Sequence, residues 1–118
     1  MIINELASND VNTTTILNTV KRDYDILAST LPNFKRRIGQ ELIIHSCAQS
    51  IIDNALLATQ AGTGTGKTFA YLLGSLPFVR DQNHHLIIST NTIALQTQLI
   101  EKDIPVIVKH LAPKLTVE

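Results

Sequence analysis

The chain has 118 residues, of which 44% are hydrophobic and 17% charged, and its formal net charge at neutral pH is zero. This length accommodates one compact domain but hardly two, and the composition differs from that of a disordered chain. Zero net charge gives no general indication of nucleic-acid or membrane binding, although a local patch can act within a neutral chain. The N-terminus has no signal-peptide pattern, and no apolar run approaches the ~18 residues of a membrane-spanning helix. We therefore expect a cytoplasmic protein without a membrane partner.

Cys47 is the single cysteine of the sequence. One thiol cannot form an internal disulfide, and by itself it cannot hold zinc or an iron–sulfur cluster. It lies in an apolar stretch with helical character, Ile43 to Ala48. Because a free cysteine behaves as a small hydrophobic residue, we expect Cys47 to pack in the core.

The first part of the chain is predicted to be helical. Apolar residues recur three or four positions apart between Asn12 and Thr30, as on one face of an amphipathic helix. The residues of this stripe are Leu17, Val20, Tyr24, Leu27 and Leu31. Pro32 is expected to end the helix, since proline cannot continue its hydrogen bonds. A second helix is predicted from Gln40 to Asp53.

The rest of the chain alternates between predicted strands and helices. In order, we expect a strand at 55–59, a helix at 68–79, a strand at 86–90, helices at 92–103 and 104–111, and a further strand beginning at 114–118. A glycine-rich segment joins the first strand to the helix that follows it. This order predicts an α/β fold, with a parallel sheet flanked by helices.

The glycine-rich segment has the pattern of a phosphate-binding loop. Its residues are Ala61, Gly62, Thr63, Gly64, Thr65, Gly66, Lys67 and Thr68, with Ala61 in place of the usual first glycine. Glycines let the backbone turn so that its N–H groups reach phosphate oxygens, and the following helix adds its positive end. Lys67 is predicted to contact the β- and γ-phosphates of ATP, and the Thr68 hydroxyl to bind Mg²⁺. A flexible linker or a helix cap is the alternative, but the strand-like and helix-like flanks favour a phosphate loop.

Three segments carry a family resemblance. Residues 61–73 resemble the Walker A region of DinG/XPD-like superfamily 2 ATP-dependent DNA helicases of the DinG/YoaA type, and residues 88–99 resemble their motif Ia. Upstream, residues 34–40 are similar to the family's Arg-x-x-Gln motif, and the resemblance extends from about Tyr24 to Glu118. It implies that residues 34–118 are the N-terminal, incomplete part of a RecA-like P-loop NTPase domain, preceded by an N-terminal helical segment at residues 1–33.

The same resemblance implies roles for individual residues. Gln40 would recognise adenine through its amide, which favours ATP over GTP, and Arg37 would support the adenine pocket. Thr90, Asn91 and Thr92 would contact the backbone of single-stranded DNA, contacts that position a strand without reading its sequence. For each of these residues a structural alternative stays open: Gln40 as a solvated helix-start residue, Arg37 as a surface charge, and Thr90 to Thr92 as the cap of the next helix.

The sequence also departs from the family pattern. Gln60 stands where relatives usually have Glu, and Gly74 where they commonly have proline. No Asp-Glu-x-His box occurs, and arginines from a second RecA-like domain and the four cysteines of a [4Fe–4S] cluster are absent from these 118 residues. No catalytic site is therefore complete, and the cluster is expected only in full-length relatives. We expect the ATP-binding N-terminal portion of a 5′-to-3′ DNA helicase of DNA repair or replication, inactive by itself.

Two other functions remain as alternatives to the helicase portion. The chain could be a truncated, non-catalytic nucleotide-binding module, or an unrelated P-loop kinase, although a kinase would lack the pattern from Thr90 to Gln98.

The isolated chain is also expected to expose apolar side chains. Ile87 and Ile88 would have no neighbouring strands to cover them, so self-association through exposed apolar surface is predicted.

Overall fold

The computed structural model describes residues 2–62 and 66–118, and between residues 2 and 11 only the course of the backbone. Within these residues the chain forms helices joined by extended or irregular segments. They are α1 (Ile2–Thr30), α2 (Ile38–Ile52), α3 (Lys67–Asp81), α4 (Ile93–Gln98), the π-helix η1 (Leu99–Asp103) and α5 (Ile104–Leu111). All five helical stretches predicted from the sequence are thus present; the last, 104–111, has the predicted ends, and the other four are shifted at one or both ends. None of the described helices is long and apolar enough to cross a membrane.

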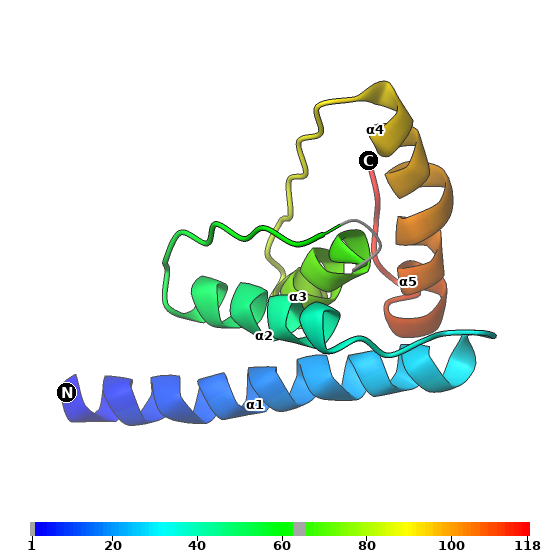
Figure 1. Ribbon diagram of the computed structural model, residues 1–118. Coiled ribbons are helices and arrows are strands. Elements are labelled where there is room, and N and C mark those ends of the chain that lie inside the picture. The colour runs from blue at the N-terminus through cyan, green and yellow to red at the C-terminus, as the bar shows by residue number, and fades with distance from the viewer. Residues whose placement is uncertain (1, 63–65) are drawn as a thin grey trace.

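Helix α1 is a long rod along one side of the molecule (Figure 1). It begins at Ile2, ten residues before the predicted start at Asn12. Its predicted stripe faces the other helices: Val20, Tyr24 and Leu27 are buried, and Leu17 and Leu31 pack against the core. Contacts with α2, α3 and α5 follow from this stripe. After Leu31 the chain turns at Asn33, whose positive φ of 62° is tolerated by asparagine.

Helices α2 and α3 form the most extensive helix pair of the structure. Their contact depends on Gly74 of α3, which is buried against α2. A Cβ atom at Gly74 would lie 2.7 Å from the Cβ of Cys47 and 2.8 Å from the carbonyl oxygen of Ile44. The missing side chain therefore lets the two backbones approach closely. Cys47 is half-buried at this contact, where burial raises the pKa of its thiol, so its predicted packing role is confirmed.

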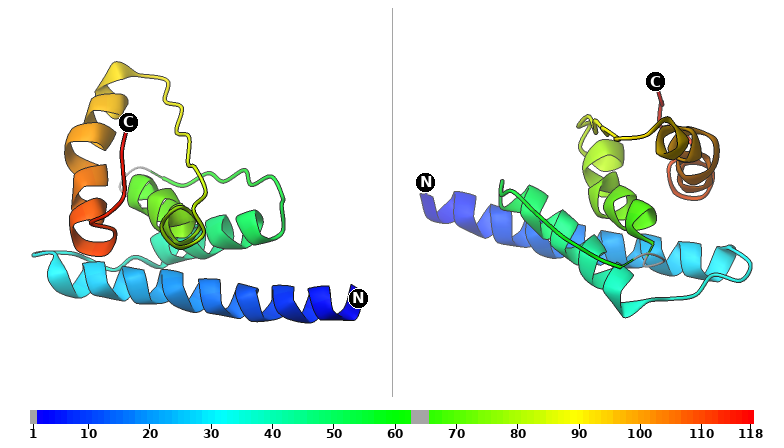
Figure 2. Two further views of the ribbon diagram at one scale, coloured as in Figure 1. Left: turned by 180° about the vertical axis from the view of Figure 1, so that it is seen from behind. Right: turned by 45° about the horizontal axis from the view of Figure 1, so that its top comes forward.

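The C-terminal helices form one nearly continuous column, which rises from the C-terminal end of α1 (Figure 2). Thr92 caps the column, since its hydroxyl accepts a hydrogen bond from the Leu95 N–H at 3.2 Å. Leu99 is buried, as predicted, together with Ile107 and Leu111. Leu95 and Ile100, which were also predicted to face inward, remain exposed.

Arg80, near the end of α3, connects three helices. Its Nη1 lies 3.0 Å from Oδ2 of Asp23 on α1 and donates to the Leu111 carbonyl of α5 at 3.3 Å. Asp23 is almost completely buried, and this burial raises its pKa in spite of the attraction of Arg80. Because both charges lose hydration, such a pair fixes the geometry of a contact more than it adds net stability.

The predicted parallel sheet is wrong. Within residues 2–62 and 66–118 no strand is formed, so the α/β, RecA-like assignment is not seen in this structure. The segments predicted as strands, 55–59, 86–90 and 114–118, have no regular secondary structure. A strand exists only through hydrogen bonds to a neighbour, and local apolar composition cannot supply that neighbour. As a result Leu56 and Ile87 have relative exposures of 102% and 90%.

The close approach at Gly74 gives a stability prediction. Gly74→Ala should lower the free energy of unfolding by about 1–3 kcal/mol, because the added methyl group overpacks the α2–α3 contact. Gly39→Ala is the matched control, since a Cβ at this position in the first turn of α2 meets nothing within 4 Å. The control should be neutral or stabilising by about 0.5–1 kcal/mol. Urea unfolding followed by circular dichroism measures both, and equal effects of the two variants would contradict the assigned contact.

Candidate functional site

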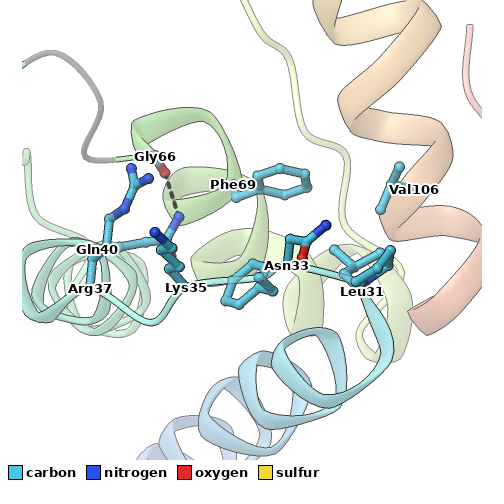
Figure 3. Close-up of a pocket in the computed structure, with 10 residues that line it drawn as sticks. Leu31, Asn33, Lys35, Arg37, Gln40, Gly66, Phe69 and Val106 are labelled. Atoms are coloured by element: carbon cyan, nitrogen blue, oxygen red, sulfur yellow. Dashed lines mark hydrogen bonds between the residues drawn. The ribbon is translucent and has the colours of Figure 1, made fainter.

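A pocket of about 430 Å³ lies where the connection between α1 and α2 meets the start of α3 (Figure 3). It is lined by Leu31, Pro32, Asn33, Phe34, Lys35, Arg37, Gln40, Gly66, Phe69 and Val106. The lining combines aromatic and aliphatic walls with a few polar and cationic groups. Three of the residues predicted from sequence to bind nucleotide, Arg37, Gln40 and Gly66, meet in this pocket.

Gln40, in the first turn of α2, holds two parts of the chain together. Its Oε1 accepts a hydrogen bond from the Tyr24 hydroxyl of α1 at 2.8 Å. Its Nε2 donates to the carbonyl oxygen of Gly66 at 3.0 Å (Figure 3). The residue has a relative exposure of 4%; its bond to Tyr24 is buried and its bond to Gly66 is partly buried. Gln40 is therefore a buried bridge, and the alternative of a solvated helix-start residue is not what the structure shows.

Gly66 is the last glycine of the phosphate-loop segment and the N-cap of α3. Its φ of 74° lies in the left-handed region, which glycine adopts without strain. A Cβ atom at this position would also fall on the amide nitrogen of Gln40. The Gly66 carbonyl accepts a second bond, from the Ala70 N–H at 3.1 Å. Glycine is thus needed here both for backbone conformation and for the contact with α2.

Lys67 is exposed at the first position of α3, and its ammonium group donates to the Ala61 carbonyl at 2.8 Å. This bond brings together the two ends of the segment from Ala61 to Lys67. Thr68 follows on α3 and is partly buried. It adjoins Tyr71, whose pKa is raised by burial and lowered to a smaller extent by the Thr68 side chain. Thr63, Gly64 and Thr65, also predicted to bind phosphate, lie outside the described residues.

The basic residues before α2 differ in what they contact. Arg36 pairs with Asp25 of α1 and with Glu41 of α2, and its guanidinium carbon lies 5.1 Å from the centre of the Tyr24 ring. These contacts attach the segment to α1. Arg37 is exposed and extends from the start of α2 toward Gly66 (Figure 3). Lys35 also lines the pocket, so two cations are available there to an anionic ligand.

The residues predicted to contact DNA lie in the turn that precedes α4. The Thr90 hydroxyl donates to the Thr92 carbonyl at 3.2 Å, and the Thr92 hydroxyl serves as the N-cap. Asn91 is exposed between them. Both hydroxyls therefore have local partners, and these three residues are not part of the pocket lining.

Sequence reasoning missed several residues that shape the pocket. Tyr24 was interpreted as an ordinary member of an apolar stripe, yet its hydroxyl reaches Gln40 and also accepts the Arg37 N–H at 3.3 Å. Phe34 meets the Tyr24 ring edge-on, with centroids 5.6 Å apart. Phe69 and Val106 bring α3 and α5 to the pocket wall. A tyrosine on an otherwise aliphatic stripe was the available signal, because a buried hydroxyl needs a polar partner.

Comparison with known proteins identifies the relatives of this chain. It is 41% identical over 95 residues to the ATP-dependent DNA helicase DinG of Photobacterium profundum, and 34% identical over 94 residues to DinG of Escherichia coli. The ATP-dependent DNA helicase YoaA of Escherichia coli is 42% identical over 85 residues. The chain is homologous to helicases of the DinG type.

The matches cover 76%, 78% and 72% of this chain but only 13–14% of the relatives. The chain therefore spans only a small part of the length of these relatives. No family model matches the sequence, and no solved structure matches it. The pocket geometry is therefore an observation of this structure alone.

The Gln40 bridge leads to a second stability prediction. Gln40→Leu should cost about 1–3 kcal/mol of unfolding free energy, since the Tyr24 hydroxyl loses its acceptor and the Gly66 carbonyl loses one donor. Gln49→Leu is the control, because Gln49 bonds only to the exposed Asp53 carboxylate at 3.0 Å. Its effect should stay within about 0.5 kcal/mol. Chemical denaturation of both variants tests the bridge, and equal stabilities of the wild type and Gln40→Leu would exclude it.

Proposed function

We propose that this chain binds ATP with Mg²⁺ at the pocket and the adjoining segment from Ala61 to Thr68. The observation that carries the proposal is the meeting of Arg37, Gln40 and Gly66 at the N-terminus of α3. The free N–H groups and the dipole of this 15-residue helix favour a bound anion at that end. The printed names of the relatives describe ATP-dependent enzymes, which supports the same ligand.

Lys67 and Thr68 are assigned to the polyphosphate end of the nucleotide. In the described structure Lys67 bonds to a neutral carbonyl, that of Ala61. Exchange of this neutral acceptor for an anionic phosphate oxygen pairs the ammonium group with an opposite charge, which strengthens the bond. The Thr68 hydroxyl, one residue into α3, is proposed as a ligand of Mg²⁺. The exposed cation Lys35 adds positive charge at the pocket, and Arg37 is proposed to support the adenine pocket.

Gln40 is assigned to the base. A glutamine amide has two N–H donors and an oxygen that accepts two hydrogen bonds. Gly66 uses one donor and Tyr24 uses one acceptor site, so one donor and one acceptor remain. A paired donor and acceptor matches adenine, which offers an amino group beside a ring nitrogen. The aromatic and aliphatic walls of the pocket supply the apolar contact that a purine requires.

For the protein to which this segment corresponds, we propose the activity of its relatives: a cytoplasmic, ATP-dependent 5′-to-3′ DNA helicase in DNA repair or replication. Thr90, Asn91 and Thr92 are proposed to contact the sugar–phosphate backbone of single-stranded DNA. The relatives are DNA helicases by name, and hydroxyl and amide groups suit contacts that carry no sequence preference. A non-catalytic nucleotide-binding role is the second candidate.

Nucleotide binding is tested by removing the charge of Lys67. Lys67→Ala should weaken binding of ATP·Mg²⁺ at least tenfold, because a hydrogen bond to a charged group contributes about 1.5–3 kcal/mol. Isothermal titration calorimetry measures the affinity. Lys21→Ala removes an equal charge from the exposed face of α1 and should leave the affinity unchanged. Equal affinities of the two variants would contradict the assigned phosphate contact.

Hydrolysis is a separate expectation. The chain alone should show no ATPase activity stimulated by single-stranded DNA, since positioning of Mg²⁺ and water by acidic residues is essential to phosphoryl transfer. A phosphate-release assay with and without single-stranded DNA provides the measurement. Turnover that disappears in Lys67→Ala would show that these residues suffice for catalysis and would overturn this expectation.

Self-association is proposed from the exposed apolar side chains. Leu56, Ile87 and Ile93 have relative exposures of 102%, 90% and 82%, and the first two lie in unpaired extended segments. Such surfaces associate in water. The double variant Leu56→Ser/Ile87→Ser should shift the mass measured by light scattering toward that of a monomer. A monodisperse wild-type monomer at high concentration would refute the proposal.

A further inference from the structure

Tyr24 is buried on α1, yet its hydroxyl group makes two hydrogen bonds to residues of the proposed nucleotide site. The Arg37 N–H donates to the hydroxyl oxygen, and the hydroxyl in turn lies 2.8 Å from Oε1 of Gln40. The Tyr24 ring has packing partners of its own, Phe34 and the guanidinium group of Arg36. The hydroxyl therefore has a role separate from the packing of the stripe.

The directions of these bonds follow from the chemistry of the groups. A backbone N–H can only donate, so the Arg37 N–H fixes the Tyr24 oxygen as its acceptor. The Tyr24 proton is then directed to Gln40, which must present an oxygen to receive it. Burial raises the pKa of Tyr24, so the hydroxyl keeps this proton throughout the neutral range. The second partner of the Gln40 amide is the Gly66 carbonyl. A carbonyl oxygen can only accept a hydrogen bond, so Gln40 must present its nitrogen to Gly66.

The two anchors of the Gln40 amide differ in their surroundings. Tyr24 lies inside a 29-residue helix that packs on α2, α3 and α5. Gly66 belongs to the segment proposed to enclose phosphate, and it joins α3 at a left-handed turn. The bond to Gly66 is only partly buried, whereas the bond to Tyr24 is buried. The bond to Tyr24 is therefore the anchor that is shielded from water.

We propose that the Tyr24 hydroxyl is a positioning residue for base selection: it holds the Gln40 amide with its oxygen toward α1 and one N–H toward the pocket. This inference rests on the proposed ATP site and deepens it. An amide held in one orientation offers its remaining donor and acceptor in a fixed order, which fits adenine and opposes guanine. An amide free to flip by 180° offers either order, so discrimination between the two bases is lost.

Tyr24→Phe removes the hydroxyl and keeps the ring, so it is the decisive variant. The ratio of the dissociation constants for GTP and ATP, measured by calorimetry, should be about tenfold or more in the wild type and several-fold lower in Tyr24→Phe, in which Gly66 alone orients the amide. The affinity for inorganic triphosphate, which has no base, should be the same in both. Ser29→Ala removes another hydroxyl of α1, which bonds to the Ile26 carbonyl of its own helix, and should leave the ratio unchanged.

A double-mutant cycle separates positioning from a general structural effect. If Tyr24 acts through Gln40, Tyr24→Phe should change the GTP-to-ATP ratio in the wild type and have no further effect in Gln40→Ala. A ratio unchanged by Tyr24→Phe, in a wild type that binds ATP, would overturn the inference and leave the proposed ATP site intact. An equal loss of triphosphate binding in Tyr24→Phe would also overturn it, because the hydroxyl would then support the fold. Absence of ATP binding by the wild type would instead refute the proposed function, and the inference with it.

Discussion

The arrangement of the pocket depends on one buried side chain, that of Gln40. Its amide bonds to the Tyr24 hydroxyl of α1 and to the Gly66 carbonyl at the start of α3. The three groups come from positions 24, 40 and 66, so a single residue of α2 connects the N-terminal helix to the phosphate-loop segment. Away from water such bonds are strong, and a missing partner is costly. The position of Gly66, and with it the start of α3, is therefore set from α1 and α2.

Close packing of α3 on α2 makes this bridge possible. Gly74, two turns further along α3 than Gly66, permits backbone contact with α2 at Ile44 and Cys47. Arg80 then ties the far end of α3 to Asp23 and Leu111. Helix α3 is thus held at its beginning, middle and end by different interactions. This rigid placement suits a helix whose N-terminus is proposed to face phosphate, because a preorganised site spends less binding energy on ordering.

The sequence predicted the helices well and the sheet wrongly, for a physical reason. Apolar spacing of three and four is a local property, so α1 and its buried Val20, Tyr24 and Leu27 could be found from periodicity. A strand depends on a neighbour elsewhere in the chain, and Ile87 has the composition of a buried strand without having one. At the site, Arg37, Gln40 and Gly66 were predicted and do meet in one pocket. Tyr24 was not predicted to belong to the site, because its hydrogen bond to Gln40, 16 residues away in sequence, depends on how α1 and α2 pack.

The most direct test of this account is the environment of the Gln40 side-chain amide in solution, measured by nuclear Overhauser effects in a ¹⁵N-labelled sample. The structure places the Gln40 amide nitrogen beside the Cα of Gly66 and the amide oxygen beside the Tyr24 hydroxyl. We expect strong effects from the Gln40 NH₂ protons to the Gly66 α-protons and slow exchange of those NH₂ protons with water. Gln40 NH₂ protons that exchange rapidly with water and show no nuclear Overhauser effect to the Gly66 α-protons would contradict the bridge on which the account depends.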